Sequence, residues 1–294
     1  MGDTIDLFIS YIREVKNVSE NTAVSYKRDL IKMSEYFRDQ GILSLKKINS
    51  TNINTYILYL EKNGRAPSSI SRTIAAMKSY FHYMLQIGKI SKEPTMSVKG
   101  PIIEKKTPVV LELSEIENLL EKPKTDNIKG IRDKAMLELL YATGIRVSEL
   151  INLKVEDINL QLGYILCKDS KKERIVPFGI PAKKAVMSYL DGPREAMLRD
   201  NKCDLLFLNC SGTGMSRQGF WKIIKHYGEM AGIADKITPH TLRHSFALHL
   251  VQNGANLHAV QEMLGHSAVS TTQMYANMKN VKIRDEYSKS HPRK

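Results

Sequence analysis

The chain has 294 residues, of which 42% are hydrophobic and 26% charged, and it carries a formal net charge of +13. This composition is typical of a globular protein and excludes a disordered chain, and the length favours two domains. The three cysteines are odd in number and lack a CxxC spacing, so neither a disulfide framework nor a zinc ribbon is predicted. The basic charge favours a polyanionic partner, because lysine and arginine neutralise phosphates and release counterions.

The hydropathy pattern indicates neither a secretory signal nor a membrane span. The opening residues MGDTIDLFISYIREV lack a basic segment followed by a long apolar stretch. No window approaches the roughly 18 consecutive apolar residues of a membrane helix. We therefore expect a soluble cytoplasmic protein with no membrane partner, in which the cysteines stay reduced.

The first hundred residues predict helices separated by turns. Helical apolar spacing and flanking polar or glycine residues indicate helices over residues 4–15, 19–40, 50–63 and 67–87. In the fourth, Ile70, Ile74 and Phe81 recur at helical spacing and are expected to enter a core. The following segment, KEPTMSVKGPIIEKKTP, is rich in proline and lysine and predicts an extended linker.

The remaining chain predicts a second, mainly helical domain. Ser114 and Glu117 have the spacing of a capping box at a helix start. A β-hairpin is expected from residues 163–167 and 173–178 with a turn at 168–172, and a further strand at 205–208. Helices should occupy most of 216–276. The fold class is therefore mainly α, of the α+β type, with a helical domain over 1–90, a linker over 91–108 and a second domain over 109–294 that ends in a tail for interactions.

Three segments of the second domain hold residues suited to phosphodiester chemistry. They are ATGIRVSEL at 142–150, TPHTLRHSFALHL at 238–250 and LGHSAVSTTQMYANM at 264–278. In order and spacing they resemble the tyrosine recombinase family. The hairpin sequence KKERIVPFG and the ending SKSHPRK resemble the Xer branch of that family, and the resemblance covers essentially the full chain.

The resemblance implies that Tyr275 attacks a DNA phosphate and stays attached to it, which conserves the bond for religation without ATP. A tyrosine with an ordinary pKa of about 10 is ionised in only about one molecule in a thousand at neutral pH. Other groups must therefore accept or stabilise charge. By the resemblance, Arg146 and Arg243 bind the nonbridging phosphate oxygens, His240 assists proton transfer, and His266 donates a hydrogen bond to the phosphate.

The departing 5′ oxygen needs a proton, and the family supplies it from a lysine in the hairpin turn. The usual turn, Gly-Lys-Gly-x-Lys-Glu-Arg, contains glycines that the sequence CKDSKKER lacks. We expect Lys168 to be the general acid, with Lys171 as the alternative. Glu149, one helical turn after Arg146, matches an acidic supporting position of the family.

Other chemistries have weaker support in the sequence. His240 and His244 have the spacing of a zinc helix, but Thr241 stands where the glutamate is needed. The sequence SGTG at 211–214 lacks the Gly-Lys-Ser/Thr of a nucleotide-binding loop. No cluster of acidic residues suggests a two-metal nuclease. We therefore predict neither a metal nor a cofactor.

The resemblance also implies how the protein works with partners. A SAM-like N-terminal domain would bind core DNA and clamp the duplex together with the catalytic domain, and homo- or heterotetramers would assemble on two sites. For the Xer branch it implies resolution of chromosome dimers with a sister recombinase and a septal DNA translocase. The alternatives are a mobile-element integrase, a type IB topoisomerase and an inactive DNA-binding protein.

The segment after Tyr275 is too short to form a core of its own. Residues 281–287 suit a short helix carrying Val281, Ile283 and Tyr287. By the resemblance we expect this tail to dock on a neighbouring protomer. Folding back onto its own domain is the alternative.

Overall fold

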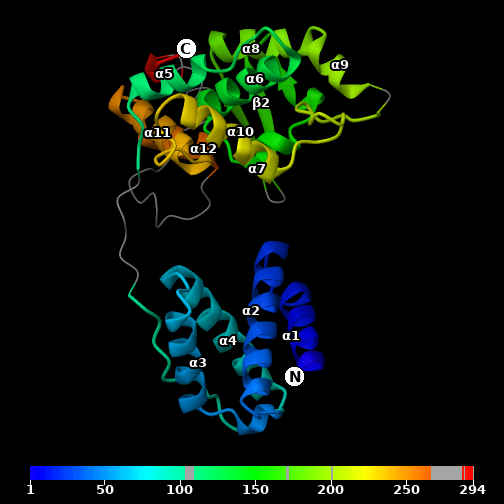
Figure 1. Ribbon diagram of the computed structural model, residues 1–294, viewed down its shortest axis with the longest axis vertical. Helices are drawn as coiled ribbons and strands as arrows, with labels where there is room; N and C mark the ends of the chain where they lie inside the picture. The colour runs from blue at the N-terminus through cyan, green and yellow to red at the C-terminus, as the bar shows by residue number, and fades with distance from the viewer. Residues whose placement is uncertain (103–108, 170–171, 200, 266–286, 288, 294) are drawn as a thin grey trace. The chain divides into compact units, whose positions relative to one another are not determined.

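A computed structural model describes residues 1–102, 109–169, 172–199, 201–265, 287 and 289–293. The chain forms two compact units, Met1–Lys106 and Thr107–Lys294, which are described separately. Helices dominate both units, and a small sheet lies in the second (Figure 1).

The N-terminal unit contains the four helices that the sequence predicts. They are α1 (Gly2–Glu14), α2 (Glu20–Asp39), α3 (Ser50–Lys62) and α4 (Pro67–Gln86), with a short 3₁₀ helix, η1 (Leu45–Lys47), between α2 and α3. Ser19 caps α2 by accepting a hydrogen bond from the backbone N–H of Thr22. Pro67 begins α4, where its missing N–H leaves no bond unmade.

Helix α4 packs against the other three helices of this unit. Its predicted apolar stripe is buried, and Tyr80 meets Phe8 of α1 edge to face with ring centroids 5.5 Å apart. Ile90, which follows α4, and Val98, from the segment predicted as a linker, are buried in the same core. The linker segment is not extended throughout, because residues 94–97 form a turn. Val98 gains by burial against the helices, whereas Met96 and Ile102 are exposed.

The second unit is built around α6 (Ile128–Thr143), which is buried along most of its length. It packs against α5 (Leu113–Glu121), α8 (Ile180–Leu190), α9 (Pro193–Leu198) and α11 (Pro239–Gln252), as Figure 1 shows. Helices α7 (Val147–Asn152), α10 (Arg217–Met230) and α12 (Leu257–Leu264) and a 3₁₀ helix, η2 (Val155–Asp157), complete the helical part.

The start of α5 differs from the predicted one. The helix begins at Leu113, and the backbone N–H of Glu112 donates to the carboxylate of Glu115 (2.9 Å). The capping box predicted at Ser114 and Glu117 is therefore wrong by two residues. A glutamate carboxylate at Glu112 fills the capping position here, which the preference for serine did not anticipate.

The sheet has the antiparallel order β1-β2-β3, formed by Ile158–Asn159, Tyr164–Asp169 and Lys172–Pro177. The predicted hairpin is confirmed, but its strands reach further towards the turn than expected. Lys168 lies in β2 opposite Glu173, and the register continues to Asp169 opposite Lys172. The predicted turn over 168–172 is therefore wrong at both ends, because Lys168, Asp169 and Lys172 belong to the ladder.

The strand predicted at 205–208 is also wrong. Leu205 forms an isolated bridge with Lys154, and Leu208 forms another with Gly214. Burial of the run, with Leu206 and Phe207 fully inaccessible to solvent, explains its strand-like composition. An apolar run of this length signals a core segment without specifying strand pairing.

The described part of the C-terminal tail packs against its own domain. The hydroxyl of Tyr287 accepts a hydrogen bond from the backbone N–H of Gly179 (3.0 Å), and its ring stacks on His291. Arg293 donates to the buried carboxylate of Glu138 (2.6 Å). These contacts favour folding back over the predicted docking on a neighbour, while Val281 and Ile283 lie outside the described residues.

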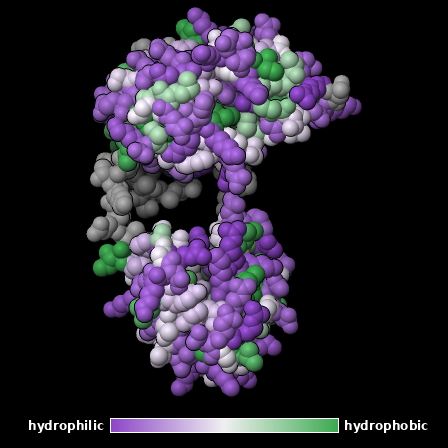
Figure 2. Space-filling view, in the orientation of Figure 1, coloured by the Kyte–Doolittle hydropathy of each residue, from purple (hydrophilic) through white to green (hydrophobic). Residues whose placement is uncertain are grey.

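Hydrophilic side chains cover most of the visible surface of both units, and apolar side chains appear as separate patches (Figure 2). Of the helices described above, none is long and apolar enough to cross a membrane.

Gly144, which ends α6, should be sensitive to substitution. Its φ is +59°, and an added Cβ would lie 2.2 Å from a ring carbon of Phe246. Gly144→Ala should lower the free energy of unfolding by about 2–5 kcal/mol through backbone strain and overpacking. Urea denaturation of the purified protein measures this change.

Gly232 provides the matched control. It has a φ of +74° but no heavy atom within 4 Å of an added Cβ. Gly232→Ala should therefore cost only the backbone strain, about 1–2 kcal/mol. Equal losses in the two variants would contradict the close contact with Phe246.

Candidate active site

Arg146 lies at the start of α7, directly after the turn that ends α6. Its backbone is extended, and its N–H donates to Oε2 of Glu149 (2.7 Å). Its guanidinium Nη1 lies 3.1 Å from Oε1 of the same carboxylate. Glu149 therefore caps the helix and orients the guanidinium of Arg146 at the same time.

Arg174 of β3 binds the same carboxylate. Its Nη1 and Nη2 donate to Oε1 and Oε2 of Glu149 at 2.8 and 2.9 Å, and both side chains are 11% exposed. Burial opposes ionisation of Glu149, but the hydrogen bonds and charges of Arg174 and Arg146 outweigh it and lower the pKa of the carboxyl. Glu149 is therefore a carboxylate held between two arginines.

Arg243 comes from the middle of α11 and is 8% exposed. Its Nη1 donates to the carbonyl of Gly144 (2.8 Å) and its Nη2 to the carbonyl of Leu264 (2.5 Å). Burial, followed by the nearby charge of Arg146, lowers the pKa of Arg243 to about 10. The guanidinium therefore stays charged at neutral pH.

The C-terminal end of α12 is the place where these arginines meet. Helix ends leave carbonyl groups without helical partners, and their partial negative charge attracts cations. Three consecutive carbonyls are satisfied by three arginines, with Met263 accepting from Arg174 Nε (2.9 Å), Leu264 from Arg243 Nη2 (2.5 Å) and Gly265 from Arg146 Nη2 (2.8 Å). The cluster thus lies directly before position 266.

His240 lies in the first turn of α11, three residues before Arg243. Residues at this spacing lie on the same side of a helix. His240 is exposed, whereas Arg243 is buried. The imidazole is therefore accessible to a large ligand that reaches this side of α11.

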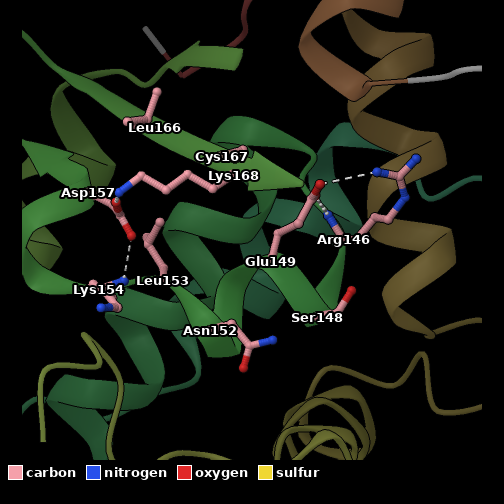
Figure 3. Close-up of a pocket in the computed structure, with 10 residues that line it drawn as sticks. All are labelled: Arg146, Ser148, Glu149, Asn152, Leu153, Lys154, Asp157, Leu166, Cys167 and Lys168. Carbon is pink, nitrogen blue, oxygen red and sulfur yellow. Dashed lines mark hydrogen bonds and ion pairs between the residues drawn. The ribbon is translucent and has the colours of Figure 1, made fainter. Parts of the chain in front are cut away.

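Lys168 points away from the arginine cluster. Its Nζ lies 2.5 Å from Oδ1 of Asp157, a carboxylate that is 7% exposed. Figure 3 shows the Lys168 side chain extending towards Asp157 and away from Arg146, across a cavity of about 440 Å³. The hydrogen bond with Asp157 raises the pKa of Lys168. The ammonium is therefore protonated but occupied by another carboxylate.

The alternation of β2 explains this orientation. Successive strand residues face opposite sides, and Cys167, which pairs with Arg174, is buried. Lys168 must then face the other side of the hairpin from Arg174. The structure brings Arg146, Arg243 and Glu149 together. Lys168 lines the same cavity as Arg146 and Glu149, but its ammonium pairs with Asp157.

Three residues named from the sequence, Lys171, His266 and Tyr275, lie outside the described residues. Arg174 and Asp157 were missed by the sequence reasoning. The alternation of β3 could have found Arg174. It stands two residues before the buried Val176, so its side chain faces the interior of the domain. Among the described residues, no group of three or more histidine, cysteine, aspartate or glutamate side chains is placed to hold a metal ion.

Comparison with known proteins assigns the chain to a family. The model for the phage integrase family matches residues 109–281, and the model for the phage integrase N-terminal SAM-like domain matches residues 5–88. The chain belongs to the phage integrase family. Together the two models cover most of both units of this phage integrase.

Individual relatives agree with this assignment. This phage integrase is 42% identical over 296 residues to tyrosine recombinase XerD of Listeria innocua serovar 6a, and 43% identical over 294 residues to XerD of Staphylococcus epidermidis, with 100% of each chain covered. The crystal structure of the XerH site-specific recombinase bound to its difH substrate has a TM-score of 0.71 at 26% identity, covering 92% of this chain and 81% of that one. The protein is thus a site-specific tyrosine recombinase.

The shared carboxylate of Glu149 predicts a pH-dependent contribution to stability. Its pKa is lowered in the folded protein, so the ionised form stabilises the fold above the ordinary glutamate pKa of about 4.3, and this contribution is lost as the pH falls through the folded value. Glu149→Gln should therefore destabilise the protein most at neutral pH and progressively less in acid. Urea unfolding of both proteins at pH 7 and at low pH measures this difference, and a constant difference would contradict the assignment.

Proposed function

We propose that this tyrosine recombinase cuts and rejoins duplex DNA through a 3′-phosphotyrosyl intermediate formed by Tyr275. The convergence of Arg146 and Arg243 on the end of α12 is the observation that carries the proposal. Both guanidiniums use two N–H groups in the contacts described, and each has five. They can therefore also bind the nonbridging oxygens of a phosphate at this place.

The chemistry requires stabilisation of charge on the phosphate. As Tyr275 attacks phosphorus, negative charge grows on the nonbridging oxygens, and fixed cations lower the barrier most at that point. Arg146 and Arg243 supply the cations in this proposal. His240 assists removal of the tyrosine proton, and His266 donates to a phosphate oxygen.

The leaving 5′ oxygen receives its proton from a hairpin lysine, Lys168 or Lys171. If Lys168 has this role, its ion pair with Asp157 must break, and its side chain must turn the ammonium towards the phosphate across the cavity that it shares with Arg146. Contacts of this kind often form only in the complex with substrate. Glu149 supports the reaction by holding Arg146.

Duplex DNA is the proposed partner, and the net charge of +13 favours it. Residues 1–90 would bind the core site, residues 109–294 would carry the reaction, and 91–108 would connect them. Recombinases bound to DNA are among the similar solved structures, including the XerH complexes before and after cleavage. We further propose a tetramer on two sites, with a sister Xer recombinase and a septal DNA translocase as partners in the cytoplasm.

Identity of 42–43% to XerD proteins over the full length favours a XerD-like role in resolving chromosome dimers. A mobile-element integrase is the second candidate. The Tn1549 transposon integrase has a TM-score of 0.73, but its 20% identity indicates the fold alone. The full-length identity therefore favours the chromosomal role.

Trapping the covalent intermediate tests the proposed function. The wild-type protein should form a denaturation-resistant adduct with specific genomic sites, in EDTA and without nucleotide, and sequencing the bound DNA identifies the site. Tyr275→Phe should bind the same DNA with unchanged affinity but form no adduct, since only the attacking hydroxyl is lost. An adduct formed by Tyr275→Phe would refute the assigned nucleophile.

A substrate with sulfur in place of the scissile 5′ oxygen identifies the general acid, because a thiolate leaves without a proton. Lys168→Ala should cleave the oxygen substrate slowly and the sulfur substrate at nearly the wild-type rate. Lys171→Ala is the matched variant. Rescue of Lys171→Ala alone would transfer the role to Lys171.

A further inference from the structure

We propose that Arg174 is a positioning residue that fixes the β2–β3 hairpin against the phosphate-binding arginines, so that the hairpin can deliver its proton to the leaving group. This inference rests on the proposed recombinase function. Arg174 would act through the hairpin without touching the DNA.

The contacts of Arg174 join three parts of the site. Its two terminal nitrogens form a bidentate pair with Glu149 of α7, and its Nε donates to the carbonyl of Met263 at the end of α12 (2.9 Å). A planar guanidinium can make all three bonds at once, which a lysine ammonium cannot do in the same geometry. The side chain is nearly buried, so water competes little with these bonds.

Gly265 accommodates this arrangement. A Cβ at this position would lie 2.8 Å from Cζ of Arg174, and the φ of +63° also favours glycine. The guanidinium therefore packs directly on the backbone that precedes position 266. This contact fixes β3 with respect to the end of α12.

The ladder of the hairpin transmits this position to Lys168. Arg174 pairs with Cys167, the neighbour of Lys168, and the β2–β3 register runs without interruption from Tyr164–Pro177 to Asp169–Lys172. Loss of the Arg174 side chain would release this end of the hairpin from both helices. Lys168 on β2 would then lose its fixed position relative to Arg146, with which it shares a cavity.

The position of Arg146 depends less on Arg174 than the position of the hairpin does. Glu149 still accepts from the backbone and guanidinium of Arg146, and Arg146 still reaches the carbonyl of Gly265. Removing Arg174 should therefore impair proton delivery to the leaving group more than charge stabilisation. The sulfur substrate separates these two effects.

Arg194 provides a matched structural control. It also uses its guanidinium to bind backbone carbonyls, those of Cys203, Leu205 and Leu206. It belongs to α9 and contacts neither the hairpin nor α12 in the bonds described. Arg194→Ala removes another part-buried arginine that holds backbone carbonyls, and it tests whether any local loosening gives the same kinetics.

The experiment measures single-turnover cleavage by the full-length protein, using the duplex recovered from the wild-type adduct with oxygen or sulfur at the scissile 5′ position. Arg174→Ala should slow cleavage of the oxygen substrate by roughly 100-fold, as expected for a misplaced catalytic group, and should slow the sulfur substrate by about threefold at most. Arg174→Lys should lie between the wild type and Arg174→Ala. Arg194→Ala should change both rates by the same factor.

Equal slowing of both substrates by Arg174→Ala, or unchanged rates with both, would overturn the inference. If Arg174→Ala does not fold, Arg174→Lys replaces it in the test. A ratio of sulfur-substrate to oxygen-substrate cleavage rates equal to that of the wild type would count against a positioning role of Arg174. Failure of the wild-type protein to form any adduct would instead refute the proposed function. The two failures are therefore distinguishable.

Discussion

The capping of α12 by three arginines is the interaction on which the rest of the site depends. Placing three guanidiniums close together is unfavourable, because their positive charges repel one another and burial removes their hydration. Two features offset that cost, namely the carboxylate of Glu149 between Arg146 and Arg174 and the carbonyls that end α12. The carbonyl groups at the end of α12, which lack partners within the helix, thus hold the guanidiniums in place.

This arrangement has a consequence for substrate binding. Arg243 is buried and stays charged, and Arg146 is held at two points before any ligand arrives. A phosphate would meet donors that are already oriented, so little reorganisation is needed in the transition state. Lys168 is different, since its ammonium is paired with Asp157 on the other side of the hairpin. Proton delivery by Lys168 therefore requires its side chain to leave Asp157.

The core of the second unit connects the tail to the helix that carries Arg243. Tyr141 of α6 forms a hydrogen bond with His249 of α11 (2.9 Å), and Tyr141 and Phe246 of α11 both pack against His291 of the tail. Burial lowers the pKa of His291 to about 4, so the imidazole is neutral at physiological pH and packs as an aromatic ring. The tail residues that the structure describes are thus part of the domain core.

Local patterns in the sequence determined most of the helices, the hairpin and the basic character of the protein. The apolar spacing of α4 and the cap at Ser19 involve residues a few positions apart, so the sequence displays them directly. Motif resemblance likewise singled out Arg146, Arg243 and Glu149 as one group. Tertiary structure alone decided that Arg174 joins them and that the Lys168 ammonium pairs with Asp157. Arg174 and Met263 are 89 residues apart, and Arg146 and Gly265 are 119 apart. Contacts at such separations depend on how helix ends and strands pack, and no pattern within a short window of sequence records that packing.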